Sequence, residues 1–275
     1  MIDFHCHSTY SDGSDSVNEI FESALASGIQ QLALTDHDTV AGVAELRSLC
    51  DNSSVSCING IEFSTRWKKH DIHIVGLHID IQDPEINKRI DLQKKCRFER
   101  AKNIAEILER LGLSNCWSKA RKVAGHTHIA RPHFAQVLVE EGWTATIQQA
   151  FSSYLSRGKP AYVATNWMSI PEAIQDITSA GGVAVLAHPL KYKLTHTKLC
   201  ELIKHFKENG GHALEVVSGD MQKKEVNDLA ELCEEYELYA SSGSDYHGKK
   251  RSRIGLGAQR CIPEQCKPVW TLWER

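Results

Sequence analysis

Several features that mark common protein classes are missing from this 275-residue sequence. Its 32 Lys and Arg nearly balance 35 Asp and Glu, which argues against a protein that coats duplex nucleic acid through one basic face. No apolar run is long enough to cross a bilayer, and Met1–His5 does not resemble a signal peptide. The nine cysteines form no CxxC pair and are odd in number, which favours reduced thiols in a cytoplasmic protein. Because no apolar run is long, we expect no membrane partner.

Histidine, by contrast, is abundant. The chain has 14 histidines, many of them next to Asp or another His. Imidazole is a common metal ligand in proteins. The composition therefore predicts metal chemistry, and a small anionic substrate bound by local basic residues is compatible with the low net charge.

Short apolar segments alternate with helical patterns over most of the chain, which favours parallel strands in an α/β fold. In the middle of the chain this alternation stops and the pattern is helical. A long polar helix is expected at 84–113, followed by helices at 129–141 and 144–154, and the next strand is expected at 161–163. We therefore predict a distorted (β/α)7 barrel with an all-helical insertion. The predicted domains are 1–94, 95–164 and 165–275, namely the first part of the barrel, a substrate-capping insertion and the second part of the barrel.

Each predicted barrel strand is expected to end on a residue of a type that binds metal ions, a histidine or a carboxylate. Barrel enzymes build their active sites at the C-terminal ends of several strands, so these side chains should meet in space. Residues two apart in a strand share a face, which points His5 and His7 the same way and Cys6 away from them. The strands expected at 2–5, 32–35, 55–64, 72–81, 183–187 and 238–242 supply the candidates His5, His7, Asp12, His37, Glu62, His73, His188, Asp245 and His247.

Each candidate alone also has a purely structural explanation. Asp12 is typical of a turn, and Asp36 and Asp38 flank a helix start that either could cap. A single Glu62 or His188 is more often a hydrogen-bonded core residue. Their recurrence along the barrel favours a shared site instead. Imidazoles and carboxylates without thiolates suit a catalytic site for Mn, Fe or Zn, and so many candidates suit two or three ions.

The ordered motifs resemble those of the polymerase and histidinol phosphatase (PHP) family. They are His-x-His with Asp12, Thr-Asp-His-Asp at 35–38, Gly-x-Glu at 60–62, Ala-His-Pro at 187–189 and Ser-Asp-x-His at 244–247. The resemblance implies a distorted (β/α)7 barrel with three divalent ions, Mn²⁺ being expected and Fe²⁺ or Zn²⁺ the alternatives.

The resemblance also implies the ligands of each ion. The first set is His5, His7, Glu62 and Asp245; the second is Glu62, His73 and His188; the third is Asp12, His37 and His247. His78 competes with His73, but residues 73–76 match the family's own segment, so we prefer His73. Asp36 or Asp38 could orient a ligating imidazole.

Four further segments, at 60–67, 73–77, 130–135 and 157–163, resemble the branch of this family that contains the 3′,5′-nucleoside bisphosphate phosphatases, also described as the 5′→3′ exoribonuclease ribonuclease AM. The resemblance implies hydrolysis of the 5′-phosphate of adenosine 3′,5′-bisphosphate and release of 5′-terminal nucleotides from short single-stranded RNA. The general acid stays unassigned. We expect the nucleotide and RNA ends as partners, and no protein partner is predicted.

A second phosphate on the substrate needs its own anchor. Arg97 and Arg100 lie one turn apart on the long helix, and Arg131 with His133 begins the next helix, where an anion is favoured. Arginine binds phosphate oxygens bidentately. We predict these four residues to bind substrate, the alternative for Arg97 and Arg100 being a solvated helix face.

Other substrate contacts are weaker candidates. Basic candidates are Lys159, Lys191 and the run 249–251, and Trp67, Trp117, Trp143 and Trp167 could stack on a base or lie in the core. Three rival functions also stay open: a histidinol-phosphate phosphatase on the same metal site, an amidohydrolase that also begins its barrel with His-x-His, and a non-catalytic metal-binding regulatory protein. The helical insertion and Arg131 argue against the first of these.

Overall fold

The computed structural model describes residues 1–126, 128–249 and 251–274. The chain forms two compact units, which we call the barrel unit (Met1–Ile90 with Trp167–Arg275) and the helical unit (Asp91–Asn166). None of the helices in the described ranges combines the length and the apolar character that a bilayer crossing needs.

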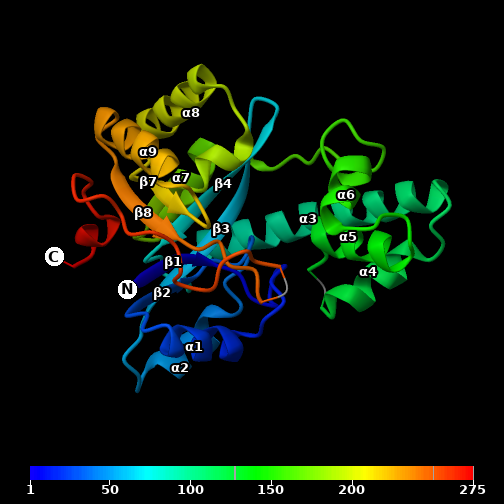
Figure 1. Ribbon diagram of the computed structural model, residues 1–275, viewed down its shortest axis with the longest axis horizontal. Coiled ribbons are helices and arrows are strands. Elements are labelled where there is room, and N and C mark those ends of the chain that lie inside the picture. Colours follow the sequence, from blue (N-terminus) through cyan, green and yellow to red (C-terminus); the bar gives the residue numbers. More distant parts are fainter. Residues whose placement is uncertain (127, 250, 275) are drawn as a thin grey trace. The chain divides into compact units, whose positions relative to one another are not determined.

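The barrel unit is a nearly closed mixed barrel with the strand order β1-β2-β3-β4-β6-β7-β8 (Figure 1). Parallel pairing joins β1 (Ile2–Cys6), β2 (Gln31–Leu34) and β3 (Ser56–Trp67), and also β6 (Val183–Leu186), β7 (Ala213–Ser218) and β8 (Tyr239–Gly243). Just past β8, Asp245 N–H donates to His5 O and His7 N–H donates to Tyr246 O, both at 2.8 Å. These bonds bring the two edge strands of the barrel together beside two of the predicted ligands.

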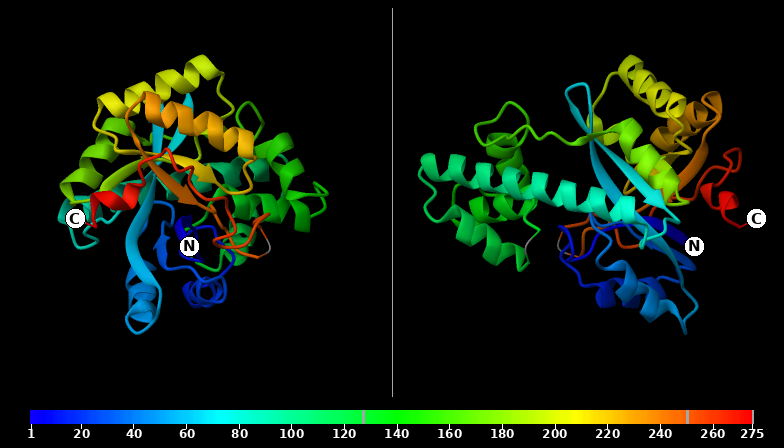
Figure 2. Two further views of the ribbon diagram at one scale, coloured as in Figure 1. Left: turned by 60° about the vertical axis from the view of Figure 1, so that its left-hand side comes forward. Right: turned by 180° about the vertical axis from the view of Figure 1, so that it is seen from behind.

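Strand β4 (His70–Leu77) runs antiparallel to both of its neighbours, β3 and β6. Our prediction of parallel pairing was therefore wrong at this strand. Only Lys68 and Lys69 separate β3 from β4, and a parallel pair needs a crossover of a dozen or more residues. The two strands form a long twisted hairpin, seen most clearly in Figure 2.

Helices cover the outside of the barrel (Figure 1). They are α1 (Val17–Ala26), α2 (Val43–Cys50), α7 (Ile170–Ser179), α8 (His196–Glu208) and α9 (Lys223–Glu235). Ser16 caps α1 and Ser169 caps α7, each in a reciprocal capping box with the glutamate three residues later. Each of these two helices thus begins at a serine that satisfies an otherwise free backbone N–H group.

The helical unit has a hydrophobic core of its own, in which Leu108, Phe134, Leu138 and Leu155 are fully buried. Its elements are the later part of α3 (Pro84–Arg110), α4 (Cys116–Ala124), α5 (Arg131–Glu140) and α6 (Ile147–Ala150), which continues into a π-helical turn at Phe151–Leu155. The sequence pattern did not predict α4, whose buried face consists only of Cys116 and Ala120.

The chain returns to the barrel unit through a short strand, β5 (Met168–Ser169), which pairs in parallel with the far end of β3. The strand expected at 161–163 was wrong, because these residues lie in a turn and an irregular segment. Tyr154 O accepts the backbone N–H of Ala161 at 2.9 Å, so the segment is tied to the preceding π-helical turn rather than to a sheet.

Candidate metal centre

All nine histidine and carboxylate candidates lie together in the barrel unit. Their side chains form four overlapping groups, within each of which one nitrogen or oxygen atom of every residue lies within 4.8 Å of those of the others. The groups are His7, Asp12, His37 and His247; His5, His7 and Asp245; His5, Glu62 and His188; and His37, Glu62 and His73. This spacing suits atoms that share a metal ion.

Glu62 is the hub of the cluster and is fully buried. Its Oε1 lies 2.9 Å from Nδ1 of His73, 3.0 Å from Nε2 of His188 and 3.3 Å from Nε2 of His5. Its Oε2 lies 2.7 Å from Nδ1 of His37 and 3.3 Å from Nε2 of His7. One carboxylate thus faces imidazoles on two sides, as a residue that bridges two ions would.

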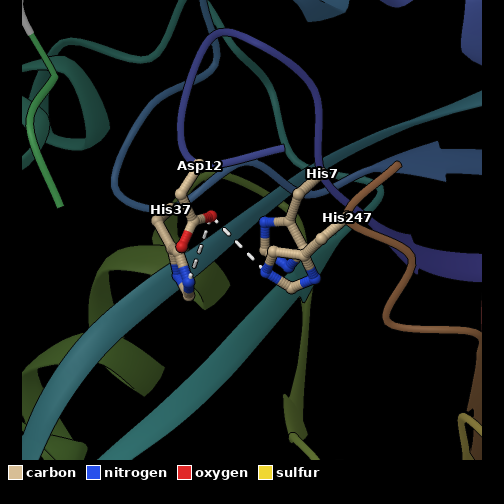
Figure 3. Close-up of side chains that lie close together, drawn as sticks. All are labelled: His7, Asp12, His37 and His247. Carbon is tan, nitrogen blue, oxygen red and sulfur yellow. Dashed lines mark ion pairs between the residues drawn. The ribbon is translucent and has the colours of Figure 1, made fainter. Parts of the chain in front are cut away.

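The carboxylates of Asp12 and Asp245 both lie near the ring of His247. Oδ1 of Asp12 lies 3.4 Å from Nε2 of His247 and 3.8 Å from Nε2 of His37, with the ring of His7 beside them (Figure 3). Oδ1 of Asp245 lies 3.3 Å from Nε2 of His7, and its other oxygen accepts the ammonium of Lys191. Both carboxylates therefore stand among imidazole nitrogens.

The donor set fits a group of divalent ions. Within the described residues, Nε2 of His5, Nε2 of His7 and Oδ1 of Asp12 are buried and have no hydrogen-bond partner, although other candidate atoms lie near them. Buried polar atoms are rarely left in this way unless another ligand satisfies them. The clusters support a multi-metal site whose ligands are nitrogen and oxygen.

The carboxylates of the cluster are ionised, which suits cations, whereas its histidines differ in pKa. Burial would raise the pKa of Asp12, Glu62 and Asp245, but neighbouring positive groups hold all three pKa values well below the ordinary range. For Asp12 and Glu62 these groups are histidines, and for Asp245 Lys191 acts most strongly. Burial, together with His247 and His37, lowers the pKa of His7 to about 3. At His247 burial is outweighed by Asp12 and Asp245, which raise the pKa to about 9, and at His5 it is outweighed by Glu215, Glu62 and Asp245, which raise the pKa well above its usual value. Because ionised carboxylates and neutral imidazoles are the forms that bind metal ions, metal binding would displace protons from His5 and His247.

The reversed direction of β4 explains how His73 reaches the site. Because β4 is antiparallel, its first half, and not its C-terminal end, lies beside the ends of the parallel strands. His73 lies directly opposite Ser64 on β3 and reaches Glu62 diagonally. His78, the competing candidate, is exposed beyond the other end of β4 and stacks on Trp273 at 5.7 Å. Cys6 points away from the histidines, and its thiol donates to Ala33 O.

Sequence reasoning missed Glu215, a carboxylate that contacts the cluster. Glu215 on β7 is 2% exposed, and its Oε1 lies 2.9 Å from Nδ1 of His5. The sequence does contain a signal for this residue, because Glu215 is the only charged residue in the strand Ala-Leu-Glu-Val-Val-Ser. We expected Asp36 or Asp38 to orient an imidazole. Asp36 accepts hydrogen bonds from Ser8 and Ser11 of the loop that carries Asp12. Asp38 accepts the backbone N–H of Ser64.

The four predicted substrate-binding residues all belong to the helical unit. Arg97 and Arg100 are 8% and 9% exposed, so the alternative of a solvated helix face is wrong. Arg131 begins α5, and the Nδ1 atom of His133 accepts the backbone N–H of Ala130 at 3.0 Å. Arg97 also lines a cavity of about 320 Å³, together with Lys94, Lys95, Phe98, Glu99, His128 and Ile129.

Two of the weaker basic candidates contact residues of the cluster. Lys191 pairs with Asp245, and the guanidinium of Arg251 donates to the backbone carbonyl of Asp12. Lys159 is exposed in the helical unit, and Lys250 lies outside the described residues. Trp67 and Trp167 are each 6% exposed, and Trp117 and Trp143 pack against the core of the helical unit.

Comparisons with known proteins agree with this architecture. The family model of the PHP domain matches residues 3–219. The chain is 39% identical to a Haemophilus influenzae protein named 5′-3′ exoribonuclease, over 98% of this chain and 97% of that protein. It is 36% identical to a Chromobacterium violaceum protein named 3′,5′-nucleoside bisphosphate phosphatase, over 98% and 95% of the two chains.

A solved structure from Chromobacterium violaceum has the same fold. That protein is described as an amidohydrolase with bound sulfate and no metal; its TM-score is 0.94 at 36% identity, over 99% of this chain and 95% of that one. The match confirms the predicted barrel and extends through the helical unit. The chain therefore belongs to the PHP domain family.

Proposed function

We propose that this chain is a metal-dependent phosphoesterase that removes the 5′-phosphate of nucleoside 3′,5′-bisphosphates, such as adenosine 3′,5′-bisphosphate, and releases 5′-terminal nucleotides from short RNA. The observation that carries the proposal is the buried cluster of nine imidazoles and carboxylates centred on Glu62. Full-length relatives named for the two activities support the choice of substrate. In both reactions water attacks the 5′ phosphorus of a nucleotide that carries a 3′-phosphate group.

Three divalent ions, with Mn²⁺ the first choice and Fe²⁺ or Zn²⁺ the alternatives, fit this cluster. His5, His7, Glu62 and Asp245 would hold the first ion, and Glu62, His73 and His188 the second. Asp12, His37 and His247 would hold the third. The spatial groups support sharing of Glu62, and they also associate it with His37. Bound divalent ions supply an activated water at neutral pH and neutralise phosphoryl charge.

The chain's own residues position the reacting groups. The buried carboxylates keep their negative charge, and the hydrogen bonds of Asp36 hold the loop that carries Asp12 in place. In the helical unit, Arg97, Arg100, Arg131 and His133 would bind the 3′-phosphate, and the cavity beside Arg97 offers basic groups and the ring of Phe98 to a nucleotide. We assign the helical unit the role of a substrate-capping domain on this basis.

A reducing cytoplasm is the proposed location. The cysteines are all free thiols, including the buried Cys6, Cys50, Cys116, Cys233 and Cys266. Thiols without disulfides are typical of that compartment.

Phosphate release from adenosine 3′,5′-bisphosphate tests the proposal directly. Chelator-stripped protein is assayed with and without Mn²⁺, and 5′-AMP is the matched substrate that lacks the 3′-phosphate. We expect release that depends on Mn²⁺ and strongly prefers the bisphosphate. Equal rates on both substrates would remove the 3′-phosphate anchor from the proposal, and no release with any metal would overturn it.

Assays of the same protein preparation on other substrates test two alternative functions. The structural relative described as an amidohydrolase makes amides and lactones a necessary control, and hydrolysis of these but not of phosphate esters would favour that class. Histidinol phosphate tests the other branch of the family. A higher kcat/KM on it than on the bisphosphate would reassign the substrate but keep the metal site.

A further inference from the structure

Glu215 is a buried carboxylate on β7, a strand of otherwise uncharged residues. It is 2% exposed, and its neighbours along β7, Leu214, Val216 and Val217, are fully buried. A carboxylate in such surroundings is costly unless each oxygen has a partner. Oε1 lies 2.9 Å from Nδ1 of His5, and Oε2 accepts the backbone N–H of His188 at 2.5 Å. Both partners belong to residues of the candidate metal centre.

The first contact determines which ring nitrogen His5 presents to a metal. Nδ1 faces Glu215, so it keeps a proton to donate to that carboxylate. The lone pair is then left on Nε2, which lies 3.3 Å from Oε1 of Glu62 and 3.5 Å from Oδ1 of Asp245. A hydrogen bond at the second nitrogen is the usual way in which a protein fixes the orientation of a ligating histidine.

The second contact holds an unusual turn. His188 lies just after β6 and has φ 28° and ψ 58°, a left-handed backbone conformation that residues other than glycine rarely adopt. Its backbone N–H is held by Oε2 of Glu215, and its ring points Nε2 at Oε1 of Glu62 at 3.0 Å. The carboxylate therefore stabilises the backbone from which this imidazole projects.

The surroundings leave room for this arrangement only because residue 243 is glycine. A Cβ atom on Gly243 would lie 2.2 Å from Cβ of His5 and 2.9 Å from Oε1 of Glu215. Cβ of His5, the carboxylate of Glu215 and the backbone of β8 thus lie close together, and Glu215 has little freedom to move.

We propose that Glu215 is a positioning residue of the metal centre, which sets the ring nitrogen of His5 and the backbone turn of His188 and so raises the affinity for the ions that these histidines hold. The inference rests on the metal site of the proposed function. Glutamate is required because both partners donate hydrogen bonds, so two acceptor oxygens are needed. Glutamine has nearly the same shape but offers one acceptor, and it would place an N–H against one of the two donors.

The test compares Glu215→Gln with Glu231→Gln, a control at an exposed position on α9. Chelator-stripped proteins are dialysed against graded free Mn²⁺, and the metal bound per chain is measured. We expect Glu215→Gln to need about 10- to 100-fold more free Mn²⁺ for half-occupancy of at least one site, and the control to match the wild type. At saturating Mn²⁺, kcat should return toward the wild-type value. Coincident metal titrations of the two variants would overturn the proposal.

A second measurement needs no variant at position 215. In Zn²⁺-loaded wild-type protein, ¹⁵N NMR of the imidazoles, with the His5 signals identified by their loss in His5→Asn, should show a protonated Nδ1 and a metal-bound Nε2. Metal bound through Nδ1 of His5 would overturn the proposal even if Glu215→Gln did not fold. Wild-type protein that binds metal without hydrolysing the bisphosphate would contradict the proposed function and leave the role of Glu215 intact.

Discussion

Glu62 and His73 contact each other diagonally across an antiparallel strand pair, with Oε1 of Glu62 2.9 Å from Nδ1 of His73. The residues directly opposite them are Val75 and Ser64. A one-residue change of register would turn one of the two side chains to the other face of the sheet. The short connection between β3 and β4, which fixes this register, is therefore part of what builds the cluster.

Replacing Glu62 by Gln should disrupt the centre most severely. The variant keeps the shape but loses the charge that faces five histidines, so several ions lose a ligand at once. We expect less metal per chain and phosphatase activity lower by more than about 100-fold. The exposed Glu22→Gln on α1 is the control. Wild-type metal content in Glu62→Gln would show that the ions bind elsewhere.

Removal of metal should lower thermal stability as well as activity. Ions that bind the folded chain stabilise it, by about 2.7 kcal/mol at a free concentration 100 times Kd. At about 2 °C or more per kcal/mol for chains of this size, Mn²⁺ should raise the Tm of stripped protein by about 5 °C or more. Differential scanning calorimetry with Mn²⁺, Mg²⁺ and chelator measures this shift. An unchanged Tm in saturating Mn²⁺ would contradict a buried metal centre.

Arg131→Ala should reduce selectivity for the 3′-phosphate. A charged hydrogen bond contributes about 1.5–3 kcal/mol, so kcat/KM for adenosine 3′,5′-bisphosphate should fall by about 10- to 100-fold while that for 5′-AMP changes little. Arg121→Ala, at an exposed position on α4, is the matched control. An unchanged ratio of the two kcat/KM values in Arg131→Ala would remove this residue from the substrate site.

Gly243→Ala should displace His5. The added Cβ would lie 2.2 Å from that of His5, and the surrounding strand cannot give way without cost. Overpacking of this kind destabilises by about 1–3 kcal/mol, and the loss should appear both in urea unfolding and in metal content. At Gly255 an added Cβ has no heavy atom within 4 Å, so Gly255→Ala should leave both measurements unchanged. If the two variants had the same stability in urea and the same metal content, β8 would have to shift to accommodate the added methyl group at position 243.

The sequence predicted the cluster well because most of its residues follow from local rules. The two-residue spacing of His5 and His7, and the positions of His188 and Asp245 after apolar strands, need only the geometry of strands in a barrel. The structure brings these side chains together, and their roles as metal ligands remain predictions. The family and the barrel are confirmed by the comparisons.

Other features depend on non-local contacts that no single segment encodes. Glu215 looked like one polar residue in an apolar strand, and its significance depends on His5, which lies 210 positions away in the chain. The direction of β4 follows from the two-residue connection before it, which alternation of strands and helices does not reveal. The burial of Arg97 and Arg100 depends on tertiary packing, whereas their spacing along α3 indicated only a shared face.

The short strand β5 has a consequence for how such a protein can change over evolution. It pairs with the extended end of β3 at the point where the chain returns from the helical unit. All nine candidate ligands, and Glu215 behind them, lie outside Asp91–Asn166. Insertions, deletions or exchanges within that stretch can therefore accumulate while the reactive cluster is inherited unchanged. The two parts of the gene are free to diverge at different rates.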